Sequence, residues 1–140
     1  LIHAVAGSTV PHISLQVGNS YGAGNYAMCG RSFNPRFLFS YPNAKSGVMG
    51  ADQLAGVMEI VKRKSAMSLN KVIDENLLLE EKKKLAEQAD KKASIWHTTS
   101  EVWDDGVIDP RDTRKYLSLA LSAVYSSEIK GTDSFGVFRM

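Results

Sequence analysis

The first clear pattern in the sequence is an alternation of apolar and polar residues over PHISLQVG, positions 11 to 18. Ile13, Leu15 and Val17 alternate with polar residues, and this period of two predicts a strand with two unlike faces. A second apolar run, FLFSY at positions 37 to 41, predicts a short buried strand that a proline ends. The first third of the chain is therefore expected to contribute two strands.

Helical spacing follows these strands. Leu1 to Val5 is predicted to be the end of a helix, and a second glycine-bearing turn is predicted at positions 47 to 50. The next helix is predicted from apolar residues at i, i+3, i+4 and i+7, which are Leu54, Val57, Met58 and Val61. Residues 69 to 92 predict a strongly charged helix with a thin apolar stripe, formed by Leu78, Leu85 and Ala89. Such a helix is largely solvated or lies against a partner.

The last third of the chain predicts two further helices. Residues 93 to 104 form one helical piece in this interpretation, with Trp96 and Trp103 on one face, in the core or against another subunit. Gly106 ends this piece, and residues 107 to 108 are extended. Asp109 is predicted to cap a final helix with Pro110 at its first position, and its buried face is predicted to hold Leu117, Leu121 and Val124. The apolar ending SFGVFRM is not expected to extend into water.

Composition narrows the class of protein. The chain has 140 residues, 44% hydrophobic and 23% charged, which suits one globular domain. A net charge of +2 is too small to indicate nucleic-acid binding, and no apolar run is long enough to span a bilayer. The single cysteine, Cys29, excludes an internal disulfide and fits a reducing compartment. Because the first residue is leucine, we expect an excised piece of a longer protein.

The densest local signal is GNSYGAGNYAMCG, at positions 18 to 30. We expect a turn from Gly18 to Gly24 and a helix that begins at residues 26 to 28. Free amides at the start of a helix hold a phosphate, or an oxygen that gains negative charge during a reaction. The glycine spacing matches neither dinucleotide nor Walker patterns, and the turn contains no lysine, which favours an oxyanion hole. On the residues alone, a purely structural turn is an equally good interpretation.

Metal and thiol chemistry have weak signals. The histidines at positions 3, 12 and 97 are dispersed, so surface or core packing is the favoured role for each. Cys29 has no histidine or second cysteine nearby that would complete a ligand pair. A small buried hydrophobic residue is favoured there over a nucleophile, which stays open.

Acid–base chemistry also lacks an obvious carrier. The aspartates at positions 104, 105, 109 and 112 suit turns and caps better than a catalytic pair. Arg114 is expected to form a structural salt bridge with one of them. The lysines at positions 82 to 84 are expected on a solvated face, with a partner chain or an acidic ligand as the alternative.

Two long motifs resemble one family. The stretch SYGAGNYAMCGRSFNPRFLFSYPNAKSGVMGADQLAGVM resembles the C-terminal domain of the carboxyltransferase β subunit of biotin-dependent acyl-CoA carboxylases. The stretch VWDDGVIDPRDTR resembles the closing motif of that family, and FGVFRM resembles the end of its methylcrotonoyl-CoA member. The similarity runs over nearly the whole chain and is weakest over residues 69 to 92.

The resemblance implies an α/β fold of the crotonase (ClpP/crotonase) type, a spiral of strand–strand–helix units. Residues 1–140 would be the C-terminal portion of a carboxyltransferase C-domain, with the N-domain absent. In the family, the active site lies between the N-domain of one subunit and the C-domain of another. The N-domain mostly holds acyl-CoA and the C-domain mostly holds biotin, so we expect no turnover from this piece alone.

The resemblance also implies a reaction and its site. Carboxyl transfer from carboxybiotin leaves negative charge on the ureido oxygen of biotin, which the backbone amides of Ala23 and Gly24 would stabilise. Biotin itself serves as the base, which agrees with the missing side-chain dyad. The residues implied around biotin and substrate are Tyr21, Gly22, Asn25, Tyr26, Val48, Met49 and Gly50.

Substrate and partners follow from the same resemblance. Propionyl-type relatives read Gly-Gly-Ala-Tyr-Asp where this chain reads Gly22 to Tyr26, which favours 3-methylcrotonoyl-CoA and leucine degradation. Geranyl-CoA and propionyl-CoA carboxylases remain alternatives. The implied partners are a biotin-carrying α subunit in an ATP-binding holoenzyme and further copies in dimers and hexamers, with no nucleic acid and no membrane span. The implied location is the mitochondrial matrix in a eukaryote or the cytoplasm in a bacterium.

Two other functions are weighed against this one. Another crotonase-like enzyme, such as a hydratase, isomerase or decarboxylase, would need a side-chain acid or base near the first glycine turn. No glutamate is found there. A non-catalytic assembly domain, joined through the charged helix and aromatic surface, is the third hypothesis for the isolated chain.

Overall fold

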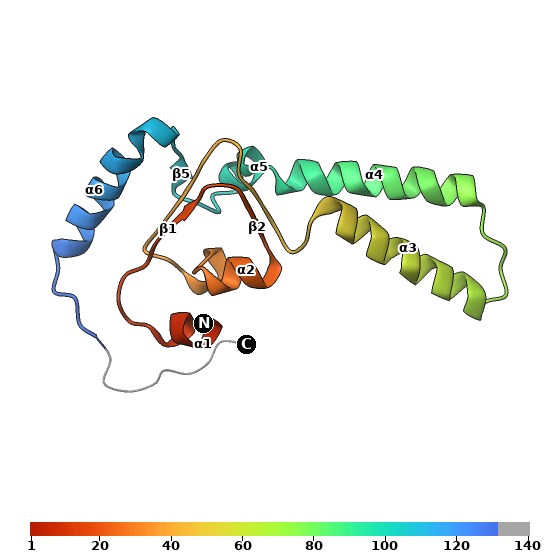
Figure 1. The fold of residues 1–140 in the computed structure, drawn as a ribbon, viewed down its shortest axis with the longest axis horizontal. Coiled ribbons are helices and arrows are strands. Elements are labelled where there is room, and N and C mark those ends of the chain that lie inside the picture. Colours follow the sequence, from red (N-terminus) through yellow and green to blue (C-terminus); the bar gives the residue numbers. More distant parts are fainter. Residues whose placement is uncertain (132–140) are drawn as a thin grey trace.

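Two strand–strand–helix units form the centre of the molecule (Figure 1). The computed structural model describes residues 1–131, so the predicted ending SFGVFRM lies outside the described residues. The first unit consists of β1 (Ile13–Gln16), β2 (Asn19–Tyr21) and α2 (Gly22–Ala27). The second unit consists of β3 (Phe37–Ser40), β4 (Lys45–Gly47) and α3 (Ala51–Ser68). The sequence shows no internal repeat, yet the backbone repeats.

The two units lie side by side through parallel strand pairing. β1 pairs with β3, with Ile13 opposite Phe37, and β2 pairs with β4, with Tyr21 opposite Gly47. A short strand β5 (Gly106–Val107) pairs with β3, which gives a three-stranded sheet in the order β1-β3-β5. Parallel strands joined by helices are the α/β architecture that we expected.

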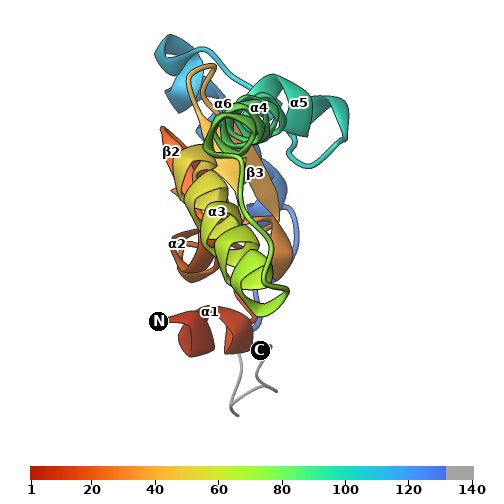
Figure 2. The same ribbon diagram turned by 90° about the vertical axis from the view of Figure 1, so that its right-hand side faces the viewer.

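The remaining elements surround the two small sheets. They are α1 (Ile2–Gly7), the 3₁₀ turn η1 (Arg31–Phe33), α4 (Glu75–Ala93), α5 (Ile95–Ser100), the 3₁₀ turn η2 (Pro110–Asp112) and α6 (Thr113–Tyr125). Figures 1 and 2 show α3 and α4 side by side as a hairpin that extends away from the sheets, with α6 at the opposite end.

The hydrophobic core lies between the three-stranded sheet and α6. Phe39, Ile108 and Ala120 form its buried centre, and the Phe39 ring lies 5.8 Å from that of Tyr116. Successive residues of a strand face opposite sides, so Leu38 and Ser40 face away from α6. Both are buried, as the apolar run at positions 37 to 41 predicted.

The first glycine segment differs from its prediction. Residues 18 to 24 do not form one turn, because β2 occupies residues 19–21 and α2 already begins at Gly22. Tyr26 and Ala27 therefore end this helix instead of starting it, and Met28 is its C-cap. Helix α2 ends through the left-handed backbone of Cys29 (φ 54°), where Gly30 N donates to Asn25 O at 2.8 Å.

The charged stretch and the tryptophan pair also need correction. The helix predicted over residues 69 to 92 begins later than expected: α3 ends at Ser68, and α4 begins only at Glu75, capped by the Asp74 side chain. Helix α5 ends at Ser100, so Trp103 lies beyond it, and Trp96 is 61% exposed. The two rings therefore share neither a helical face nor the core. Trp103 instead packs beneath the Arg31 guanidinium, 4.2 Å from the ring centroid.

The start of the last helix is close to its prediction. Asp109 accepts a hydrogen bond from Arg111 N at 2.9 Å, and Pro110 begins the turn η2 that leads into α6. The expected salt bridge of Arg114 is wrong, because Arg111 is the residue that pairs with Asp109. This pairing lowers the pKa of Asp109 to about 2. On α6, Val124 is buried as predicted, but Leu121 is 46% exposed.

Candidate active site

Two glycine turns, Gly22 to Gly24 and Gly47 to Gly50, lie next to each other where β2 and β4 end. Because these strands are parallel and Tyr21 is opposite Gly47, both segments leave the sheet at the same edge and continue into α2 and α3. Gly22 adopts a positive φ of +54°, and a Cβ at that position would lie 3.0 Å from the Val48 carbonyl oxygen. A side chain here would be both strained by this backbone angle and crowded by the Val48 carbonyl oxygen, so the glycine at position 22 allows the close approach.

Ala23 and Gly24 form the first turn of α2, directly after this contact. Both residues are exposed, and within residues 1–131 neither backbone amide donates a hydrogen bond. A Cβ at Gly24 would meet nothing within 4 Å. Two unobstructed N–H donors therefore stand next to each other at the edge of the sheet.

The other residues predicted for the first turn have contacts within the protein. The Asn25 side-chain amide donates to Ser20 Oγ at 2.9 Å. The Tyr26 ring packs edge-on against Phe33, with 5.8 Å between centroids, and is 43% exposed. Tyr21 lies over Gly47 on the neighbouring strand. The structure thus brings Tyr21 and Gly22 to the second turn, whereas Asn25 and Tyr26 contact Ser20 and Phe33.

The second turn presents an exposed surface beside these amides. Val48 is 83% exposed and Met49 is 36% exposed, while Gly50 is the N-cap residue of α3 with an extended backbone. Gly22 contacts the Val48 carbonyl oxygen, and Met49 and Gly50 follow it in the chain.

Sequence reasoning missed Lys45, which lies next to the glycine turns. It pairs with Asn19 across the strands, and its ammonium lies 2.5 Å from Asp90 on α4. The hydrogen bond to Asp90 raises the pKa of Lys45, so the side chain stays charged and ties the sheet to the hairpin. No local pattern around Lys45 predicts this contact, because Asp90 is far away in the sequence.

Cys29 has the role that the sequence favoured. Its side chain is buried, and Ser14 Oγ donates to its carbonyl oxygen at 2.8 Å. Burial raises the pKa of the Cys29 thiol, and a hydrogen bond with Ser14 opposes this shift only in part. A thiol with a raised pKa is a poor nucleophile at neutral pH.

A cavity of about 460 Å³ lies behind the turn, between α1, β1 and α2. It is lined by His12, Ser14 and Asn25 among others, but by neither Ala23 nor Gly24. The Nε2 atom of His12 is buried there without a hydrogen-bond partner among the described residues. We place the site at the free amides and not in this cavity, because the amides supply donors where charge would develop.

Within residues 1–131, no group of three histidine, cysteine or carboxylate side chains gathers as a metal site would require. None of the helices in this part of the chain has the length and apolar character needed to cross a bilayer.

Paired strand–strand–helix units joined through parallel strands are typical of an α/β fold of the crotonase type. The comparison with known families agrees: residues 1–137 match the carboxyl transferase domain, and the chain belongs to this family. It is 50% identical over 140 residues to the probable biotin-dependent acyl-coenzyme A carboxylase β2 subunit of Mycobacterium tuberculosis, covering 100% of this chain and 26% of that protein. It is 44% identical over 144 residues to the mitochondrial methylcrotonoyl-CoA carboxylase β chain of Dictyostelium discoideum, covering 100% of this chain and 24% of that protein.

Solved structures confirm the crotonase-like α/β fold. The β subunit of geranyl-CoA carboxylase from P. aeruginosa superimposes with a TM-score of 0.78 at 40% identity, over 97% of this chain and 26% of that chain. Transcarboxylase 12S, described as a hexamer assembly, superimposes with a TM-score of 0.72 at 24% identity, over 99% and 25%, and supports the fold alone. The chain spans about a quarter of the length of these relatives.

Proposed function

We propose that this chain is the biotin side of a carboxyltransferase that moves the carboxyl group from carboxybiotin to 3-methylcrotonoyl-CoA. The observation that carries the proposal is the pair of exposed amides at Ala23 and Gly24, neither of which donates a hydrogen bond within residues 1–131. Membership of the carboxyl transferase family supports the reaction class. Relatives named as methylcrotonoyl-CoA carboxylase β chains, 44% identical, support the substrate.

The two free amides are suitable donors for a ureido oxygen, which accepts hydrogen bonds. When bound, carboxybiotin supplies the carboxyl group and biotin then supplies a nitrogen base. The Ala23 and Gly24 amides would donate hydrogen bonds to the ureido oxygen and stabilise negative charge there. Because these donors are fixed in the backbone, they need no reorganisation at the moment of reaction. Val48 and Met49 offer an exposed apolar surface beside the amides.

The proposal extends to partners and place in the cell. A separate biotin-carrying α subunit would bring the cofactor to these amides, and a second β subunit would complete the site with its acyl-CoA domain. The whole enzyme would then carry out one step of leucine degradation, in the mitochondrial matrix of a eukaryote or the cytoplasm of a bacterium. Mitochondrial relatives from Dictyostelium discoideum and Arabidopsis thaliana support the first location.

Geranyl-CoA carboxylation is the second candidate, because the geranyl-CoA carboxylase β subunit is also 40% identical over 97% of this chain. Propionyl-CoA is less favoured, because the acetyl-/propionyl-coenzyme A carboxylase β6 subunit of Mycobacterium tuberculosis is 31% identical over 122 residues. Comparison of kcat/KM for the three acyl-CoA esters in the holoenzyme would rank these substrates.

The decisive experiment removes one amide from the full-length β subunit assembled with its biotin-carrying partner. Ala23→Pro deletes an N–H that has no acceptor within the helix, so folding should tolerate it better than a proline farther along. We expect kcat to fall by at least about 10²-fold, the usual cost of one lost oxyanion donor. Carboxylation of 3-methylcrotonoyl-CoA and the circular dichroism spectrum are the readouts.

A matched control comes from α1, which is also a six-residue helix. Ile2→Pro removes a first-turn amide of α1, a helix that contacts α2 but contains none of the residues predicted for the site, and it should leave kcat near that of the wild type. A folded Ala23→Pro enzyme with full activity would show that the amide does not serve the reaction.

A further inference from the structure

One side-chain hydrogen bond, between Ser20 and Asn25, closes the first turn of the candidate site, and we call this bond the bracket. Asn25 Nδ2 donates to Ser20 Oγ at 2.9 Å, and the four residues between these partners are Tyr21 to Gly24. The bracketed segment includes both amides that we propose as oxyanion donors. It also includes two glycines, which are the residues with the largest backbone freedom.

Both ends of the bracket are anchored in the fold. Ser20 belongs to β2 and is opposite Ser46 in the parallel strand β4. The Asn25 backbone is fixed by Gly30, whose amide donates to the Asn25 carbonyl oxygen at 2.8 Å. A Cβ at position 30 would lie 2.0 Å from Asn25 Oδ1, so the glycine there allows the asparagine side chain to lie flat against the backbone. The bracket therefore connects the sheet to the far end of α2.

The bracket answers a physical need of the site. Oxyanion donors contribute most when they already point at the place where charge develops. A turn that contains two glycines does not hold its amides in one direction by itself. Nothing else among the described contacts joins β2 to the α2 side chains by a polar bond, as this pair does.

We infer that Asn25 and Ser20 are positioning residues, which hold the Ala23 and Gly24 amides in line with the oxygen of the cofactor. This inference rests on the proposed function. It differs from the role that the family resemblance implies for Asn25, a direct contact with biotin. If Asn25 acted only by direct contact, the Ser20 hydroxyl would have no effect on turnover.

The sharpest test compares two substitutions of Ser20 in the assembled holoenzyme. Threonine and valine have the same shape and both suit a strand, but only threonine keeps the hydroxyl. We expect Ser20→Thr to retain most of the wild-type kcat. We expect Ser20→Val to lower kcat by about tenfold, a part of the ~10²-fold cost of losing a donor outright, with an unchanged KM for acyl-CoA.

The second arm uses Asn25→Ala and the double variant Ser20→Val/Asn25→Ala. Because both residues serve one bond, the double variant should be no slower than the worse single variant. Asn43→Ala is the matched control, since the Asn43 side chain also donates one hydrogen bond, to the Val17 carbonyl oxygen, but lies outside the bracket. Its kcat should stay near that of the wild type.

The outcomes separate this inference from the proposed function. If the wild-type holoenzyme showed no biotin-dependent carboxylation, the proposed function itself would be contradicted. An active wild type with equal kcat for Ser20→Val and Ser20→Thr would overturn only the positioning role. Losses that multiply in the double variant, a changed KM alone, or failure of Ser20→Val to assemble while Ser20→Thr assembles would also overturn it.

Discussion

Gly30 shows how a single residue outside the first glycine turn supports that turn through its contact with Asn25. A side chain at this position has no room, because its Cβ would lie 2.0 Å from Asn25 Oδ1 and 2.7 Å from the Asn25 carbonyl oxygen. The second of these atoms belongs to the backbone and cannot move aside without displacing the end of α2. The glycine is therefore required by close packing, and not by its own backbone angles.

Gly30→Ala should consequently destabilise the protein. We expect a loss on the order of 2 kcal/mol in the free energy of unfolding, the usual range for forced overpacking. Urea denaturation followed by circular dichroism measures it. Gly18→Ala is the control, because a Cβ there meets nothing within 4 Å, and its effect should stay within about 0.5 kcal/mol. Equal stabilities of the two variants would contradict this packing argument.

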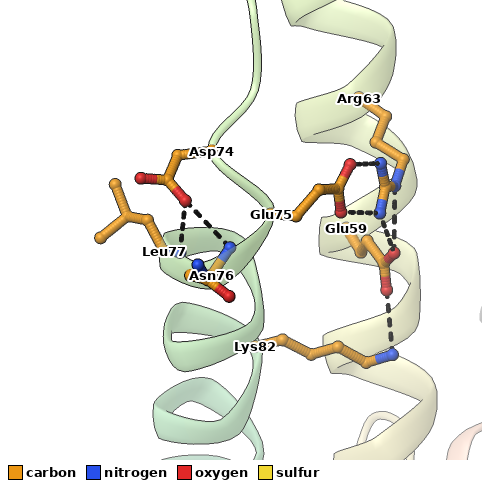
Figure 3. A network of polar contacts seen from close by, with 7 residues as sticks. All are labelled: Glu59, Arg63, Asp74, Glu75, Asn76, Leu77 and Lys82. Carbon is orange, nitrogen blue, oxygen red and sulfur yellow. Dashed lines mark hydrogen bonds and ion pairs between the residues drawn. The ribbon is translucent and has the colours of Figure 1, made fainter.

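At the scale of elements, the α3–α4 hairpin has a network of ion pairs between its helices, buries Ala55 and Leu78, and leaves larger apolar residues of α3 exposed. Arg63 donates to both carboxylate oxygens of Glu75 at 2.7 and 2.8 Å and to Glu59 at 3.0 Å, and Lys82 lies 2.9 Å from Glu59 (Figure 3). Lys62 and Glu81 add one more ion pair between the helices. Meanwhile Val57 and Val61 of α3 are about half exposed, at 45% and 51%.

This network makes the hairpin sensitive to pH. Hydrogen bonds from Lys82 and then Arg63 lower the pKa of Glu59, and the hydrogen bond from Arg63 lowers that of Glu75. Lowered pKa values in the folded state mean that the stabilisation is fully present above the ordinary glutamate pKa. The stabilisation is lost as the pH falls through the lowered values.

Arg63→Ala should therefore loosen α4 at neutral pH, because one guanidinium bridges two carboxylates. Arg63→Lys keeps the charge but not the planar fork, and we expect an intermediate effect. Hydrogen exchange of the α4 amides measures this at neutral and acidic pH, with Lys84→Ala as a control on the same helix. The difference between Arg63→Ala and wild type should shrink in acid and in high salt. A difference that stays constant with pH would contradict the role of the carboxylates.

At the scale of the whole molecule, apolar surface remains open along α3. Val57, Ile60 and Val61 are 45%, 55% and 51% exposed, although their helix has the apolar spacing that the sequence predicted. Ala55 is buried on this helix, but these three larger aliphatic side chains remain in contact with water. An apolar face of this kind is typical of surfaces that contact other protein.

The isolated chain should therefore self-associate. We expect sedimentation velocity of residues 1–140 to show dimers or larger species, and the substitutions Val57→Lys and Val61→Lys together to shift them toward monomers. Leu121→Lys on α6 is a control, since Leu121 is also exposed but lies on another helix. A strictly monomeric wild-type chain would contradict the prediction.

Much of the fold follows from local sequence. Alternation at Ile13 and Leu15, the buried run around Phe39, and the Asp109–Pro110 pair each predict an element that the structure contains. These features depend on neighbours within a few residues, so the local sequence is sufficient to predict them. The long glycine motifs likewise identify the family, because their order and chemistry are read along the chain.

Only the tertiary structure decides what the glycine turns contact. The strand β2 is three residues long and gains its hydrogen bonds from β4, far along the chain, so no local pattern separates it from a turn. The position of Trp103 is decided in the same way, by its contact with the distant Arg31, whereas the break between α3 and α4 is local, because the Asp74 side chain caps α4. The bracket from Ser20 to Asn25 becomes visible only when the backbone has folded. Local sequence therefore determines the elements that have a strong pattern of their own, whereas long-range pairing determines the short strand β2 and which residues meet at the candidate site.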